Sequence, residues 1–292
     1  MTNDEAKALF KKNIQSVEIG THNYCNRTCT FCPLSVEGVN RRKFKNTIFM
    51  KDEMYENIMK QLSEVNFAGR LDFSRYHEPT SHKEYILKKI KIARKYLPLA
   101  KISLNTNSDY INKEYHQQLV DAGVDSFAFQ AYMKNGANKF DEDEVFKRIN
   151  YITDRLGAPR INKEEHKNKE WIIYKLPERF KGKIHARNYW VNGVNRAGTV
   201  LDTNYTRTKP CTSMNKGVYI DYNGSMTACC DMLTPELHSK WEVGNLEKQP
   251  SLFLNYTSRY YTKFRERITK AEWYPNSPCI KCKRDVRGSQ AR

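Results

Sequence analysis

The chain has 292 residues, 39% of them hydrophobic and 12% aromatic, which is enough for the core of one large domain and a smaller one. This composition argues against disorder. The sequence contains no run of about 18 to 20 apolar residues, the length needed to cross a membrane. The first residues, MTNDEAKALFKK, lack the apolar segment of a secretory signal, so the cytoplasm is the expected compartment. With 50 Lys and Arg against 33 Asp and Glu, the net charge of +17 favours anionic partners.

Short apolar runs alternate with amphipathic stretches, a pattern typical of a parallel sheet covered by helices. Six strands are predicted, over 16–19, 70–73, 101–104, 126–129, 171–176 and 183–185. Helices are predicted between them over 52–65, 81–97, 112–123 and 145–157. Gly123 and Gly157 mark the ends of the last two, because glycine commonly ends a helix. The polar segment 158–170 is predicted to be a loop.

The pattern changes after about residue 199. Residues 217–230 read as two alternating strands joined by Asn223-Gly224, a strong hairpin signal. A helical segment over 251–268 and a Pro-rich turn then lead to the last two cysteines. The sequence therefore predicts a barrel-like domain over 1–200 and a small cysteine-bearing domain over 201–292.

Eight cysteines in a chain without an export signal are expected to be metal ligands or reactive thiols. Cys25, Cys29 and Cys32 lie on a short loop after the first strand, so their thiolates can bind one face of an iron–sulfur cube. One iron is then left without a protein ligand. The alternative is a zinc site completed by His22, but a strand-end position in a βα array favours the cluster over a small zinc ribbon.

The C-x3-C-x2-C spacing, with Phe31 directly before the last cysteine, resembles the signature of the radical S-adenosylmethionine superfamily. The resemblance implies a partial (β/α)6 TIM-like barrel, a 4Fe-4S cluster that binds S-adenosylmethionine, and an external one-electron donor of flavodoxin or ferredoxin type. Glu78 and Pro79 resemble the end of the family's G-G-E-P motif, although the two glycines are absent here. Glu78 is therefore expected to bind the amino group of the cofactor. Three residues after the third strand resemble the family's T-N-G turn and are expected to reach the cofactor's ribose or carboxylate: Asn105, Thr106 and Asn107.

Four further cysteines form a second set: Cys211, Cys229, Cys279 and Cys282. Their arrangement around a hairpin and a final C-x-x-C resembles the Twitch domain, a shortened SPASM extension, and implies an auxiliary 4Fe-4S cluster with four Cys ligands. Zinc is the alternative for this set. Cys230 is left over, and we interpret it as a small buried side chain, as a replacement for Cys229, or as a thiol that donates a hydrogen atom to a substrate radical.

Together these resemblances imply an oxidoreductase that removes a hydrogen atom from a substrate carbon and passes the second electron to the auxiliary cluster. The net charge favours an anionic sugar or a nucleotide-linked metabolite over a polycationic aminoglycoside. Arg41, Arg42 and Arg187 are candidate substrate contacts and Arg196 a candidate at the reacting centre, although a salt bridge is the competing interpretation for the last two.

Two other functions remain as alternatives. A peptide-modifying maturase or an epimerase would use the same radical chemistry, with Cys230 as the hydrogen donor of the epimerase. A nucleic-acid-binding protein would explain the basic surface, but no zinc-finger, RRM or OB signature accompanies it.

Overall fold

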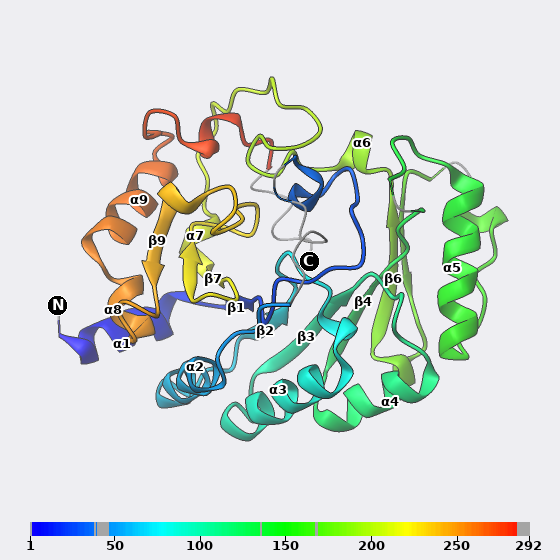
Figure 1. Ribbon diagram of the computed structural model, residues 1–292, viewed down its shortest axis with the longest axis horizontal. Helices are drawn as coiled ribbons and strands as arrows, with labels where there is room; N and C mark the ends of the chain where they lie inside the picture. The colour runs from blue at the N-terminus through cyan, green and yellow to red at the C-terminus, as the bar shows by residue number, and fades with distance from the viewer. Residues whose placement is uncertain (1, 38, 40–46, 135, 167–168, 285–292) are drawn as a thin grey trace.

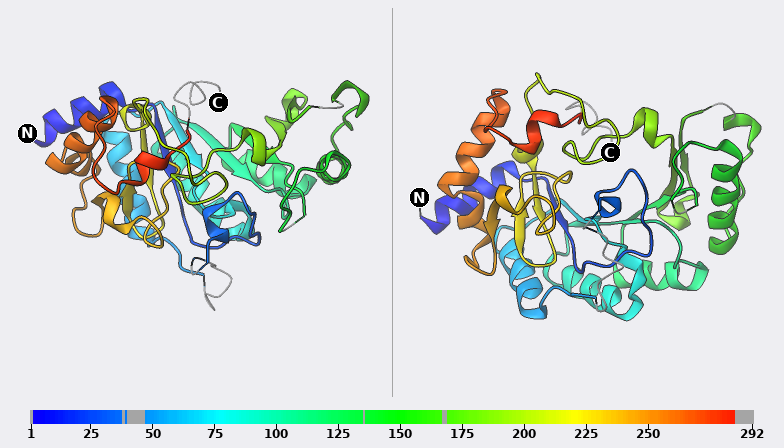
Figure 2. Two further views of the ribbon diagram at one scale, coloured as in Figure 1. Left: turned by 90° about the horizontal axis from the view of Figure 1, so that it is seen from above. Right: turned by 45° about the horizontal axis from the view of Figure 1, so that its top comes forward.

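The computed structural model describes residues 2–37, 39, 47–134, 136–166 and 169–284 (Figure 1). A curved sheet of nine strands forms its centre, in the order β5-β6-β4-β3-β2-β1-β7-β8-β9. Helices cover the outer, convex face of the sheet, and the loop that follows β1 lies inside its curve (Figure 2). Within the described residues, no helix is both long and apolar enough to span a membrane.

The barrel part follows the predicted strands and helices within a few residues. Its elements are β1 (Ser16–Ile19), α2 (Asp52–Glu64), β2 (Arg70–Phe73), α3 (Lys83–Tyr96), β3 (Lys101–Thr106), α4 (Lys113–Ala122), β4 (Ser126–Gln130), α5 (Glu142–Leu156) and β6 (Gly182–Arg187). Side chains alternate along each strand, so Val17 and Ile19 are buried under the helices while Glu18 points to the opposite, inner face. Helix α4 ends at Gly123 with φ 116° and α5 at Gly157 with φ 65°, as predicted.

One predicted strand takes a different place in the sheet. β5 (Trp171–Lys175) pairs antiparallel with β6 at the sheet edge. The connection between these two strands is too short for the crossover that a parallel pair requires. β7 (Gly217–Ile220) instead pairs with β1 in parallel, so the described residues do contain a six-stranded parallel array, in the order β7-β1-β2-β3-β4-β6.

The C-terminal third continues the sheet. β7 and β8 (Ser225–Thr227) form the predicted hairpin, in which Gly224 adopts φ 80°, and β9 (Glu242–Asn245) completes the antiparallel edge. The predicted helix over 251–268 is broken into α8 (Leu252–Tyr256) and α9 (Arg259–Thr269), because the Ser258 hydroxyl caps a new helix by accepting from the Tyr261 backbone. The short helices α6 (Tyr189–Asn192) and α7 (Ser213–Lys216) lie in the connection between the two parts.

An N-terminal helix, α1 (Asn3–Asn13), belongs to the C-terminal side of the molecule. Phe10 packs edge-on against Phe253 and Tyr256, with ring centroids 5.3 Å away in both cases. The division at residue 200 therefore stays a prediction about domains, because the helix α1 and one continuous sheet join the two parts.

Candidate functional site

A cavity lies at the carboxyl ends of the parallel strands, where the loops of an α/β barrel meet. Seven stretches of the chain line it, with these residues among them: Glu18, Cys25, Cys29, Phe31, Cys32, Tyr76, Glu78, Asn105, Thr106, Asn107, Gln130, Tyr132, Arg196 and Cys230. The three cysteines of the first predicted set therefore share one cavity with the polar residues predicted to bind a cofactor. Arg196 and Cys230, which come from the last third of the chain, complete it.

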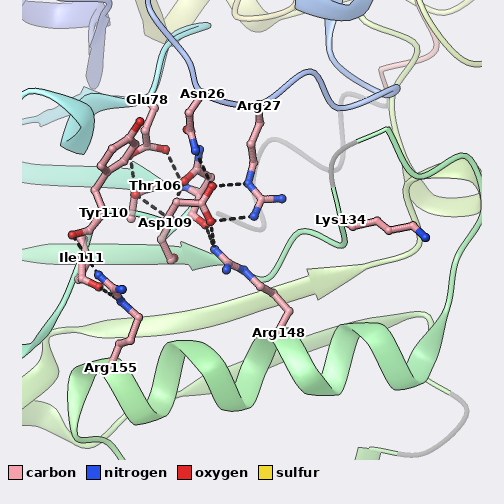
Figure 3. A network of polar contacts seen from close by, with 12 residues as sticks. Asn26, Arg27, Glu78, Thr106, Asp109, Tyr110, Ile111, Lys134, Arg148 and Arg155 are labelled. Atoms are coloured by element: carbon pink, nitrogen blue, oxygen red, sulfur yellow. Dashed lines mark hydrogen bonds and ion pairs between the residues drawn. The ribbon is translucent and has the colours of Figure 1, made fainter.

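A single carboxylate anchors the cysteine-bearing loop to the barrel (Figure 3). Asp109, which follows β3, accepts from Arg27 Nε and Nη2 at 2.6 and 2.7 Å, from Asn26 Nδ2 at 2.6 Å, and from Arg148 of α5. Burial alone would raise the pKa of this carboxyl, but the hydrogen bond from Arg27 and the charges of both arginines lower it below its ordinary value. The loop is thus held in place by a charged network that lies outside the cysteines themselves.

Glu78 ties the loop after β2 to the loop after β3. Its Oε1 accepts from the Thr80 backbone and hydroxyl at 3.0 and 2.6 Å and from the Thr106 hydroxyl at 2.7 Å. Its Oε2 accepts from the Asn107 backbone at 2.7 Å. The carboxylate is 2% exposed, and burial raises its pKa. Since Oε2 has one protein donor, it keeps acceptor capacity on the cavity side.

Burial also governs the cysteines of this loop. It raises the pKa of the Cys29 thiol to about 12 and moves the pKa of Cys25 in the same direction. Both thiols therefore carry protons at neutral pH unless a metal centre displaces them. The Asn107 side-chain amide approaches Cys25 Sγ at 4.0 Å and donates to the Asn26 side chain at 2.8 Å, which places a donor next to the sulfur.

A second, mainly apolar cavity gathers the other four cysteines. Its lining contains Cys211, Cys229, Cys279 and Cys282, with Met232 and Ile268 between them. Burial raises the pKa of Cys279 to about 11 and that of Cys282 to about 12. Cys230 lines the first cavity, although its neighbour Cys229 lines the second.

Asp231 lies between the two cavities and is completely buried. It accepts from Arg196 Nη1 at 3.1 Å, on the side of the first cavity. It also accepts from Arg284 Nη2 at 2.7 Å, on the side of the second cavity. Although burial by itself raises the pKa of Asp231, the two guanidinium groups hold it well below its ordinary value.

The remaining predicted residues have different surroundings. Arg187 is not among the residues lining the cavity; its guanidinium lies over the rings of Tyr189 and Trp171, 4.5 and 5.2 Å from their centroids. Phe31 stacks on Tyr189 with ring centroids 3.8 Å apart, which fixes the end of the cysteine loop. Arg41 and Arg42 lie outside the described residues.

Sequence reasoning missed Glu18, Arg27 and Asp109. The signal for Glu18 was available, since a carboxylate at an inward position of a buried strand is unusual. Arg27 and Asp109 are far apart in sequence, so their pairing could not be read from any local pattern.

Comparison with known proteins gives two family matches. Residues 19–131 match the radical SAM superfamily, and residues 211–283 match an iron-sulfur cluster-binding domain of the SPASM type. The first implies a 4Fe-4S cluster with S-adenosylmethionine, and the second implies a further iron–sulfur cluster.

Among individual proteins, the chain is similar to an S-adenosyl-L-methionine-dependent 2-deoxy-scyllo-inosamine dehydrogenase of Niallia circulans, with 34% identity over 116 residues. This alignment covers 40% of the chain and 44% of the relative, less than half of either protein. The crystal structure of BtrN with AdoMet and 2-DOIA has 22% identity and a TM-score of 0.65 over 93% of both chains. An open conformation of BtrN gives 18% identity and a TM-score of 0.61, over 93% of this chain and 92% of that one. These structures share the fold.

Proposed function

We propose that the chain is a radical SAM dehydrogenase that oxidises a small substrate by two electrons. The match of residues 19–131 to the radical SAM superfamily and of residues 211–283 to an iron-sulfur cluster-binding domain supports this proposal, as does the similarity to a dehydrogenase. When bound, the first cluster and S-adenosylmethionine supply the radical chemistry that removes a hydrogen atom from a substrate carbon, and the second cluster supplies an acceptor for the remaining electron. The observation that carries this proposal is the division of seven cysteines into a set of three and a set of four in separate cavities.

Cys25, Cys29 and Cys32 are the proposed ligands of the first cluster. Three thiolates leave one iron open for the cofactor, which fits a cavity that also contains uncommitted acceptor capacity at Glu78 Oε2. This oxygen is the proposed partner of the cofactor's ammonium group. Asn105, Thr106 and Asn107 are proposed to face its ribose and carboxylate, because all three line the same wall.

Cys211, Cys229, Cys279 and Cys282 are the proposed ligands of the second cluster. Four cysteines complete its coordination and leave no open position for substrate, which suits a site that only accepts electrons. Zinc would use the same four thiolates, so the metal content decides between the two. Cys230, which faces the first cavity, keeps the alternative of an epimerase in which this thiol returns a hydrogen atom to the substrate.

The proposed substrate is a sugar or cyclitol. The similar dehydrogenase acts, by its name, on 2-deoxy-scyllo-inosamine. Within the described chain, each arginine that lines the first cavity is ion-paired: Arg27 with Asp109, Arg75 with Asp221, and Arg196 with Asp231. The positive charges inside the cavity are thus neutralised, although the whole chain has a net charge of +17. An anionic part of the substrate would bind at the rim of the cavity.

Two further parts of the proposal concern the surroundings of the enzyme. Reduction of the first cluster needs an external one-electron donor of flavodoxin or ferredoxin type. None of the eight cysteines, all of which the structure describes, forms a disulfide, and this agrees with the reducing cytoplasm as the proposed compartment.

The test is the iron, sulfide and zinc content after anaerobic reconstitution. Two cubes predict about eight irons per wild-type chain and about four after Cys25, Cys29 and Cys32 are replaced by Ala. Replacing the other four ligands should also leave about four, whereas the control C230A should keep about eight. About four irons in the wild type, falling to none in the first variant, would reject the second cluster and its role as electron acceptor.

A separate experiment distinguishes oxidation from epimerisation. The reaction is run in D2O with wild type and C230A, using dithionite as reductant and following 5′-deoxyadenosine and product. Oxidation predicts no solvent deuterium at the reacting carbon. Deuterium in the product that disappears in C230A would replace the dehydrogenase with the epimerase.

A further inference from the structure

Glu18 stands in a polar row on the inner face of the sheet. In the parallel ladders, Glu18 of β1 is in register with Asp72 of β2 and with Tyr219 of β7, and Asp72 is in register with Ser103 of β3. Residues in register on neighbouring strands point to the same face. Of the four residues in this row, Glu18 is the one that lines the first cavity.

The carboxylate of Glu18 is buried without a partner of its own. The residue is 7% exposed, and its side chain makes no hydrogen bond or ion pair with any residue that the structure describes. Arg70 and Arg75 are within electrostatic reach of it. Arg70, however, pairs with Asp72 at 2.6 Å and Arg75 with Asp221 at 2.8 Å.

Such a group is costly unless something donates to it. An acceptor with little exposure destabilises the folded protein when no donor reaches it, and the effect is larger when the group is charged. The other cavity carboxylate, Glu78, accepts four hydrogen bonds from the protein. Glu18 therefore differs from it in accepting no hydrogen bond from a residue that the structure describes, while it lines the same cavity.

We propose that Glu18 binds the substrate through its carboxylate, by accepting hydrogen bonds from an ammonium group and neighbouring hydroxyls of a small polyhydroxylated amine. This inference rests on the proposed function, because it assigns the substrate to the cavity that holds Cys25, Cys29 and Cys32. A cationic donor fits best, since the cavity arginines are neutralised by Asp109, Asp221 and Asp231. Two cavity carboxylates then remain without an ion pair in the described part of the chain, Glu18 and Glu78, and Glu78 is the proposed partner of the cofactor.

The test measures binding of two probes to the anaerobically reconstituted protein with S-adenosylmethionine present. The probes are 2-deoxy-scyllo-inosamine, which carries an amine, and scyllo-inositol, which is uncharged. Calorimetry compares wild type with E18Q and with E53Q, the same charge change at an exposed position of α2. We expect the Kd of the amine to rise at least tenfold in E18Q, about 1.4 kcal/mol, and to stay within twofold in E53Q. The affinity for scyllo-inositol should fall less, because glutamine still accepts from hydroxyls.

A stability measurement separates binding from a structural role. Because E18Q removes an unpaired buried charge, the Tm of the substrate-free variant should rise above that of the wild type. A fall in Tm greater than that of E53Q would overturn the proposal, since Glu18 would then be needed for the fold.

Two other results would also overturn it: amine affinity in E18Q within twofold of wild type, or a wild type that binds neither probe. Cluster content and S-adenosylmethionine affinity are measured in the same preparations. If the wild type contains no clusters or does not bind S-adenosylmethionine, the proposed function itself fails. If both are normal and E18Q binds the amine as the wild type does, only the role of Glu18 is rejected.

Discussion

Replacing Asp231 by Asn should destabilise the protein strongly. The carboxylate is 0% exposed and is shared by Arg196 and Arg284, so the variant leaves one half-buried and one buried guanidinium group without their counter-ion. Breaking a buried ion pair in this way costs about 3 to 5 kcal/mol. An unfolding entropy of about 2.1 cal/mol/K per residue gives about 0.6 kcal/mol/K for this chain, so the Tm should fall by about 5 to 8 °C.

The assay is thermal unfolding of the reconstituted protein at one fixed scan rate, because cluster loss makes the transition kinetic. Asp202→Asn is the matched control, since Asp202 is 46% exposed and pairs with Lys283 at 3.4 Å. Its loss should stay within about 1 kcal/mol, as for other exposed pairs. Equal shifts in the two variants would refute the reasoning that burial, and not the mere presence of an ion pair, sets the cost.

The pKa of Asp231 also predicts how the difference in stability between wild type and D231N depends on pH. The pKa of Asp231 is lowered in the folded state, so its contribution to the free energy of unfolding is complete above its unfolded pKa of about 3.9. That contribution is lost as the pH falls toward the lowered folded pKa. The gap between wild type and D231N should therefore be constant from pH 6 to 8 and should narrow only below about pH 4.

Three further outcomes are expected. Asp72 should change the stability in the opposite direction to Asp231, because burial raises its pKa from 3.8 to about 6. As the pH rises from 4 to 6, this residue should lower the free energy of unfolding by up to about 3 kcal/mol. Asp72→Asn should remove this decline in urea titrations. Gly69→Ala should lower the free energy of unfolding by about 1 to 3 kcal/mol, because a Cβ would meet the Gln15 carbonyl oxygen at 2.4 Å. Gly157→Ala, with φ 65° and no atom closer than 3.7 Å, should lower it by about 1 kcal/mol. Equal losses in the two variants would contradict the clash at Gly69. Glu78→Gln should weaken S-adenosylmethionine binding at least tenfold in equilibrium dialysis while cluster content stays normal; unchanged affinity would reject Glu78 as the cofactor's partner.

Local patterns were sufficient for the barrel strands and for the hairpin at Asn223-Gly224. They were insufficient where the answer depended on distant parts of the chain. Nothing near residue 217 indicates that β7 pairs with β1, and nothing near residue 171 except the short connection indicates that β5 turns back along β6. The helix α1 was missed although Thr2 and Glu5 form a capping box, because its apolar face packs against α8, which lies far away in the sequence.

The same contrast holds for the site. The two groups of cysteines were found because their spacing is local, and the structure gathers each group in its own cavity. Asp109 and Asp231 were not singled out, because a lone aspartate in a loop has no distinguishing pattern until its arginine partners are known.

The parallel pairing of β1 with β7 sets an order of events during synthesis. Ser16 leaves the ribosome early, but the strand segment that covers its free edge begins at Gly217, about 200 residues later. Until then the nascent barrel has an uncovered edge strand, which is a template for pairing with another chain. A chain cut near residue 200 should thus aggregate instead of folding into a small barrel. A chaperone that shields β1 during this interval should raise the yield of folded protein.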